Sequence, residues 1–107
     1  MPGHYELRGN VIHIEIEGEL TLELAREARQ WIQSLPSEPP MLKQIIDLRK
    51  VTSATITPAQ VNSVAAERVF PHPARRAIIA RHAFVYGLAR EFQAHIDANL
   101  GDDIQIF

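Results

Sequence analysis

Isoleucine occupies every second position of the segment VIHIEIE, residues 11–17, and His13, Glu15 and Glu17 take the alternate positions. Because side chains of a β-strand alternate between its two faces, this pattern predicts a strand with one face in the core. The segment HYELR before it is a second extended stretch, and Gly9-Asn10 between them is typical of a tight turn. The N-terminal region therefore predicts an antiparallel β-hairpin.

Three later segments carry apolar residues at helical spacing. The first begins after Thr21, which is suited to be an N-cap, and ends near Leu35. The second begins at Thr57-Pro58, an N-cap residue followed by the residue type that favours the first helical position. The third has its apolar stripe at Val85, Leu88, Ala89, Phe92 and Ile96.

Short apolar runs between these helices predict three more strands, KQIIDL, RRAIIA and DIQIF. KQIIDL lacks alternation, which is typical of a central strand. Such a strand is covered on both faces or, in the weaker form of this interpretation, is simply covered by helices. The resulting order is β-β-α-β-α-β-α-β, and strands joined through helices favour right-handed crossovers and parallel neighbours. We therefore expect an α/β fold with a mixed five-stranded sheet, helices packed against it, and residues 1–107 forming one domain.

Composition and missing motifs exclude several classes of function. The 107 residues include no cysteine, so disulfides, thiol catalysis and cysteine-bound metal are excluded. A formal charge of −2 gives no general attraction to nucleic acid, and no apolar run is long enough for a membrane span or signal peptide. The histidines show no HxxxH or HExxH spacing, and no nucleotide-binding or nucleophile motif is present. We expect a cytoplasmic protein without catalytic residues, metal or cofactor, and an unrecognised enzyme is a minor alternative.

The whole chain resembles the small STAS-like proteins related to the bacterial anti-sigma factor antagonist SpoIIAA, also described as STAS/SEC14-like. The segments that carry the resemblance are IHIEIEGELTLE, IIDLRKVT, RRAIIARHAFVYGLAREFQAH and DDIQIF. It implies a mixed sheet with helices packed against it, and a role in protein–protein regulation or ligand sensing rather than in chemistry. Members commonly continue into one more helix after the last strand. Because this sequence ends at Phe107, the resemblance implies that the surface under that helix is open.

In antagonists of this group, a loop after the central strand carries an Asp-Ser-Ser-Gly segment in which one serine is phosphorylated. The resemblance places that segment on residues 55–58, which read Thr-Ile-Thr-Pro and retain neither the acid, the serines nor the glycine. The phosphoswitch serine motif is therefore not retained, although hydroxyl groups remain nearby.

The first candidate site is the stretch from Asp47 and Arg49 through Ser53, Thr55 and Thr57, interpreted as a regulatory or partner-binding loop. A phosphate on one of the hydroxyls would lie near a helix N-terminus, which favours negative charge. The alternative is that Thr57 caps the helix and the other hydroxyls are solvated turn residues. Asp47 ends the predicted central strand, where α/β sheets often bind ligands, or it simply pairs with arginine or loop amides.

The second candidate site comprises Arg81, Phe84, Tyr86 and Phe107. Exposed aromatic side chains favour a protein partner, and a homodimer is the preferred interpretation. The alternative is a small apolar or anionic ligand held between the sheet and its helices near residues 81–86. Residues 68–90 also contain five arginines and no acid, which could form a positive face for an acidic or phosphate-bearing partner or a solvated surface.

Overall fold

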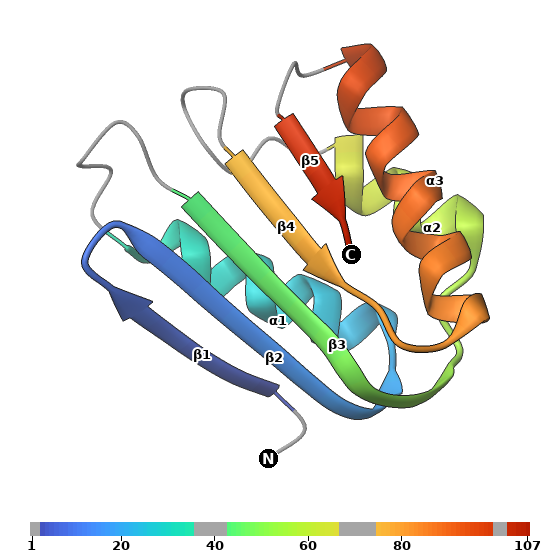
Figure 1. Ribbon diagram of the computed structural model, residues 1–107, viewed down its shortest axis with the longest axis horizontal. Helices are drawn as coiled ribbons and strands as arrows, with labels where there is room; N and C mark the ends of the chain where they lie inside the picture. Colours follow the sequence, from blue (N-terminus) through green and yellow to red (C-terminus); the bar gives the residue numbers. More distant parts are fainter. Residues whose placement is uncertain (1–2, 36–42, 67–74, 100–102) are drawn as a thin grey trace.

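The helices and strands follow one another in the predicted order (Figure 1). The computed structural model describes residues 3–35, 43–66, 75–99 and 103–107. Within these ranges the elements are β1 (Gly3–Arg8), β2 (Val11–Leu20), α1 (Leu22–Gln33), β3 (Lys43–Ala54), α2 (Pro58–Ala66), β4 (Arg75–Ile79), α3 (Ala83–Asn99) and β5 (Asp103–Ile106).

The five strands form one sheet in the order β1-β2-β3-β4-β5. β1 and β2 pair antiparallel through a turn in which Gly9 has a φ of 61°, a conformation that glycine adopts at little cost. The pairs β2–β3, β3–β4 and β4–β5 are all parallel. The prediction of a mixed five-stranded sheet with one antiparallel edge is therefore confirmed.

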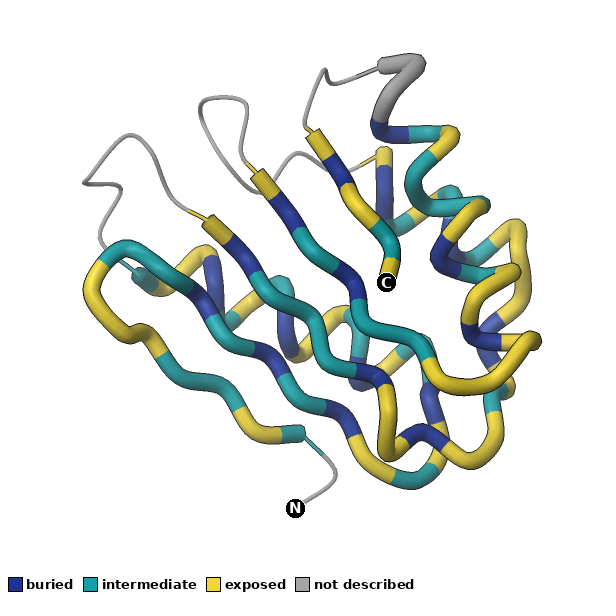
Figure 2. The backbone as a smooth tube through the Cα atoms, viewed as in Figure 1, coloured by how far each residue is buried: buried dark blue, intermediate teal, exposed yellow. Residues whose placement is uncertain are grey.

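The described helices all lie on one face of the sheet, and α1 passes behind β2 and β3 in Figure 1. This follows from topology, because successive right-handed crossovers that advance in one direction place every helix on the same side. The alternating burial of the strands, visible as bands in Figure 2, agrees with this arrangement. KQIIDL is thus covered on one face by the described helices, so the expectation of cover on both faces is wrong.

The core lies between the helices and the covered face of the sheet. Ile12, Ile14 and Ile16 of β2 are almost fully buried, as their alternation predicts. At the sheet edge, the Tyr5 ring of β1 lies 5.6 Å from the Trp31 ring of α1, which anchors the hairpin to the helix layer. The remaining buried apolar residues are Leu20, Leu24, Ala28, Ile32, Leu48, Val51, Ile56, Val61, Ala65, Ile78, Val85, Ala89, Ile96 and Ile104.

Both predicted N-caps are confirmed. The backbone N–H of Leu24 donates to Thr21 Oγ1 at 3.1 Å. Thr57 forms a reciprocal capping box with Gln60: the Gln60 N–H donates to Thr57 Oγ1 at 3.2 Å, and the Thr57 N–H donates to Gln60 Oε1 at 2.9 Å. These bonds satisfy N–H groups that the first turn of a helix leaves without intrahelical partners.

β3 is longer than the sequence predicts, because it continues through residues 49–54, which the sequence pattern assigns to a loop. β2 runs to Leu20 and supplies pairing partners along this whole length. The register shifts between Glu15 and Glu17 and again after Gly18, so β3 contains bulges. Leu48 and Val51 are both buried although they lie three positions apart. This spacing breaks the two-residue alternation by which a strand is predicted from the sequence.

Candidate functional site

The sheet face opposite the helices, which we call the open face, is the most distinctive surface of the described chain. It carries the strand side chains that alternate with the core positions, and a hollow of about 750 Å³ is lined by residues of β1, β2 and β3 and by Ile79 of β4. The members of the open face are His4, Glu6, Arg8, Val11, His13, Glu15, Glu17, Lys43, Ile45, Asp47, Arg49, Lys50, Arg75, Ala77, Ile79, Asp103, Gln105 and Phe107.

The β3–β5 half of the open face, which we call the apolar half, has an apolar centre at Ile45, Ala77 and Ile79, with Lys43, Arg75 and Asp103 at one end. Ile45 lies beside Ala77 in the register of β3 and β4, and Ile79 lies beside Asp47. Phe107 follows β5, its backbone N–H donates to the Ile78 carbonyl at 2.9 Å, and the residue is 69% exposed. Sheets built from parallel strands normally have both faces covered, whereas no helix of the described residues covers this surface (Figure 1).

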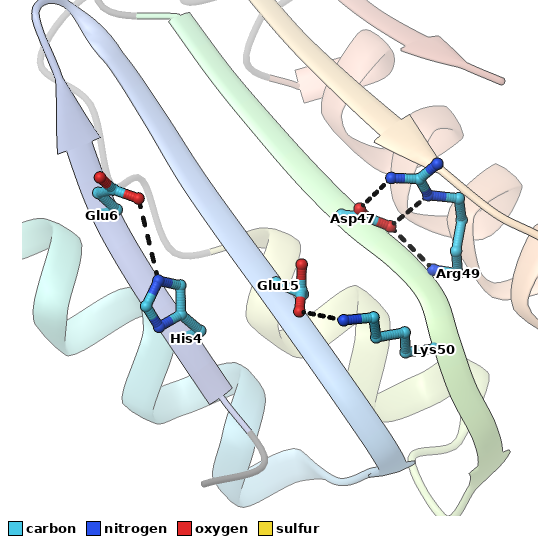
Figure 3. A network of polar contacts seen from close by, with 6 residues as sticks. All are labelled: His4, Glu6, Glu15, Asp47, Arg49 and Lys50. Atoms are coloured by element: carbon cyan, nitrogen blue, oxygen red, sulfur yellow. Dashed lines mark hydrogen bonds and ion pairs between the residues drawn. The ribbon is translucent and has the colours of Figure 1, made fainter.

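The β1–β3 half of the open face is charged, and Asp47 lies at its β3 side (Figure 3). Arg49 donates to both Asp47 carboxylate oxygens from its side chain and to Oδ1 from its backbone N–H. These hydrogen bonds lower the pKa of the Asp47 carboxyl, although partial burial opposes the shift. The interpretation of Asp47 as a partner of arginine is therefore confirmed.

The neighbouring charges also form pairs. Lys50 Nζ lies 3.1 Å from Glu15 Oε1, and this hydrogen bond raises the pKa of the Lys50 amine. Arg8 Nη2 lies 2.9 Å from Glu6 Oε2, which lowers the pKa of the Glu6 carboxyl. His4 Nε2 lies 3.9 Å from the same Glu6 oxygen (Figure 3). Acids and bases alternate across this half, so it has no strong charge of either sign.

The described residues show no metal centre on this face. Across residues 3–35, 43–66, 75–99 and 103–107, no group of three or more histidine or acidic side chains is arranged to hold a metal ion. The charged half therefore offers hydrogen bonds and ion pairs rather than coordination.

The predicted regulatory loop divides into two separate parts. Asp47, Arg49 and Ser53 belong to β3, whereas Thr55 and Thr57 lie in the connection to α2. Asp47 lies in the strand as predicted, whereas the loop prediction is wrong for Arg49 and Ser53, because strand pairing with β2 extends to Ala54. Ser53, Thr55 and Thr57 are all exposed, and the Thr57 hydroxyl acts as the predicted cap. Phosphorylation in this stretch stays a prediction.

The second predicted site is a surface rather than a pocket between layers. Phe84 and Tyr86 are 42% and 43% exposed, and Arg81 is also exposed. His82 stacks on Phe84 with ring centroids 5.6 Å apart, and the guanidinium of Arg90 lies 6.0 Å from the Tyr86 ring centroid. Phe107 follows β5 beside the end of β4, where its carbonyl accepts the Ala80 N–H at 3.0 Å, one residue before Arg81.

The described arginines of residues 68–90 do not form one positive face. Arg75 begins β4 and Arg81 follows its end, while Arg76 points into the interior and is only 6% exposed. Period-two alternation on β4 explains this separation, because Arg76 shares its face with the buried Ile78. Arg68 lies outside the described residues.

Sequence reasoning placed the alternative ligand site near residues 81–86 and missed the position of a partly open cavity of about 150 Å³ between the sheet and all three helices. Its walls are apolar except for Arg29, Gln44 and Arg76. The available signal was positional: Gln44 and Arg76 each stand two residues before a core-facing isoleucine of the same strand, at Ile46 and Ile78.

Comparison with known protein families and with curated proteins finds no match. Among solved structures, the chain is similar to an uncharacterized protein of the DUF3478 family with a SpoIIAA-like fold from Shewanella loihica PV-4. The TM-score is 0.59 at 14% sequence identity, and the match covers 98% of this chain and 83% of that chain.

A sequence identity of 14% supports a similarity of fold only. None of the helices in the described ranges has the length and apolar character to cross a membrane. The resemblance inferred from the sequence is confirmed at the level of architecture: the chain has the SpoIIAA-like, STAS-like fold, a mixed five-stranded sheet with its helices packed against it.

Proposed function

We propose that this protein is a non-enzymatic STAS-like interaction module, a single cytoplasmic domain over residues 1–107, that binds another protein through its open face. The supporting observation is the combination of parallel strands with an apolar surface at Ile45, Ile79 and Phe107 that no described helix covers. Parallel sheets are usually buried on both faces. A partner protein would supply the missing layer.

A second copy of the chain is the partner that the open face fits best. The face combines an apolar half with a half in which acids and bases alternate, and a two-fold axis lets one such surface oppose itself. Two sheets packed face to face bury their apolar side chains at a separation of about 10 Å. A nucleic-acid partner is disfavoured, because the open face has no excess of positive charge.

The chemistry of the open face supports contact rather than catalysis. Asp47 is a weak candidate base, because Arg49 occupies both of its oxygens and lowers its pKa. Lys50 and Glu15 are paired in the same way, and both side chains remain accessible to water. Ion pairs of this kind fix orientation and select partners more than they drive reactions.

Sedimentation velocity of three purified variants tests the proposal. The unmodified chain should form a dimer, and Ile79→Lys should shift it to a monomer, because a charge at the centre of the apolar half opposes burial. Phe107→Glu should act in the same direction, and it alters a residue that is already 69% exposed. Leu7→Lys is the matched control, since Leu7 is an exposed apolar residue on the other face of β1 and its variant should remain dimeric.

Circular dichroism of each variant serves as the control for folding. A chain that is monomeric at high concentration, and whose sedimentation Ile79→Lys leaves unchanged, contradicts the second-copy assignment. If a different protein binds the unmodified chain but not the Ile79→Lys variant, the open face remains the contact surface. Its partner is then that protein rather than a second copy of the chain.

A further inference from the structure

The partly open cavity between the sheet and the helices is larger than the voids that ordinary packing leaves in a protein. Its volume is about 150 Å³, and its walls come from β2, β3 and β4 on one side and α1, α2 and α3 on the other. Protein interiors contain few voids larger than a water molecule. A dry apolar cavity of about this size is known to accept a benzene-sized molecule. The space is therefore suited to a compact apolar group.

One polar place interrupts the apolar wall. Gln44 of β3 and Arg76 of β4 are register partners on adjacent strands, both point toward the helices, and they are 5% and 6% exposed. The Arg76 guanidinium lies 5.7 Å from the Phe92 ring centroid of α3. Arg29 of α1 lines the same cavity. Two guanidinium groups and one carboxamide thus border a space that is otherwise hydrocarbon.

A buried side-chain oxygen of Gln44 without a hydrogen-bond donor indicates a ligand. The Gln44 Oε1 atom is buried and accepts no hydrogen bond from the described residues. Buried polar atoms nearly always have a partner, and leaving one unsatisfied destabilises the fold. A hydroxyl or N–H group inside the cavity would supply the missing donor.

The charge of the cavity lining indicates the remaining chemistry. The described lining residues include two arginines and no aspartate or glutamate. A guanidinium has five N–H donors, so each arginine can serve a ligand in addition to contacts within the chain. Positive charge in an apolar setting favours an anion, and the fork of a guanidinium matches the two oxygens of a carboxylate.

We propose that this cavity binds a small amphipathic carboxylate with a compact apolar body and a hydrogen-bond donor. The carboxylate would accept hydrogen bonds from Arg76, the donor would satisfy Gln44 Oε1, and the apolar body would fill the space between the sheet and helices. This site is separate from the open face, so it does not depend on the proposed protein contact.

Titration of the full-length chain with three probes tests the site, with NMR chemical shifts or calorimetry as the readout. The probes are 3-hydroxybenzoate, benzoate and benzyl alcohol, which differ in the donor and in the anion. We expect 3-hydroxybenzoate to bind most tightly. Loss of the anion should weaken binding about 10- to 100-fold, since hydrogen bonds to charged groups contribute about 1.5–3 kcal/mol.

Two variants separate ligand binding from a structural role. Arg76→Met should abolish the preference for benzoate over benzyl alcohol, whereas Arg81→Met, at an exposed arginine, should preserve it. Gln44→Leu removes the unsatisfied acceptor and should remain folded. It should abolish the preference for 3-hydroxybenzoate over benzoate while benzoate still binds, a change of ratio that altered stability alone does not produce.

Three outcomes overturn the site. The first is that no probe shifts residues around the cavity at millimolar concentration. The second is that benzyl alcohol binds as tightly as the two anions, which would indicate a purely apolar void. The third is that both variants fold and retain the parental order of affinities.

Discussion

The Arg49 side chain holds both carboxylate oxygens of Asp47, with Nε 3.0 Å from Oδ1 and Nη2 2.7 Å from Oδ2. The two residues lie two positions apart on β3, so their side chains point to the same face of the strand. Because the Arg49 backbone N–H also donates to Oδ1, the carboxylate is fixed at the boundary between the charged and apolar halves of the open face. These hydrogen bonds therefore fix the positions of both side chains at this boundary.

Replacing Arg49 with methionine should raise the pKa of the Asp47 carboxyl, because its largest stabilising hydrogen bonds are lost. A lowered pKa in the folded state stabilises the fold above the pKa of the unfolded state, and this contribution disappears as pH falls through the folded-state value. The variant should therefore be less stable near neutral pH, and its stability should depend less on pH in the acid range. Carboxyl NMR titration and urea unfolding at several pH values measure both effects. An unchanged Asp47 titration in the variant would contradict the assigned cause, and Arg81→Met is the control for loss of one exposed arginine.

Thr57→Ala should lower the unfolding free energy by about 1 kcal/mol, because the hydroxyl that accepts the Gln60 N–H is lost. Thr57→Ser keeps an acceptor in the capping box and should preserve most of the stability. Thr55→Ala removes an exposed hydroxyl from the same connection and should change stability by less than about 0.5 kcal/mol. Urea unfolding compares the three variants, and equal losses for Thr55→Ala and Thr57→Ala would argue against the cap.

Gly9→Ala should lower the unfolding free energy by about 1–2 kcal/mol, because Gly9 has a φ of 61° and alanine is strained in this conformation. Gly9→Asn should cost less, since asparagine tolerates left-handed backbone better than other residues with a Cβ. The space around Gly9 is open, so any loss reports backbone strain rather than a steric clash. Thermal unfolding measures the order of the two variants, and an equal effect of both would argue for another cause.

Local signals in the sequence were sufficient for the order of the elements. The alternation of residues 11–17 predicts β2, and Thr21 and Thr57 predict the helix starts because an N-cap involves only residues three positions away. The bulges of β3 could not be predicted this way. They depend on pairing with β2, a segment distant in the sequence, and they replace alternation with the three-residue spacing of Leu48 and Val51.

The candidate site was predictable only in part, for a related reason. Asp47 and Arg49 are near neighbours, so their pairing could be expected from the sequence. The apolar half of the open face joins Ile45, Ile79 and Phe107 from three strands, and only the sheet register brings them together. The cavity likewise joins Gln44 to Arg76 across strands, and an isolated polar residue in an apolar run does not reveal its partner.

The open face as the contact surface is tested most directly by two-dimensional amide NMR spectra of the unmodified chain over a dilution series. Our proposal predicts that signals of Ile45, Asp47 and Ile79 shift or broaden with concentration, while those of the outward-facing α1 residues Arg26 and Gln30 stay constant. Concentration-dependent changes confined to α1, or to Phe84 and Tyr86 on α3, would contradict it and place the contact on the helix layer.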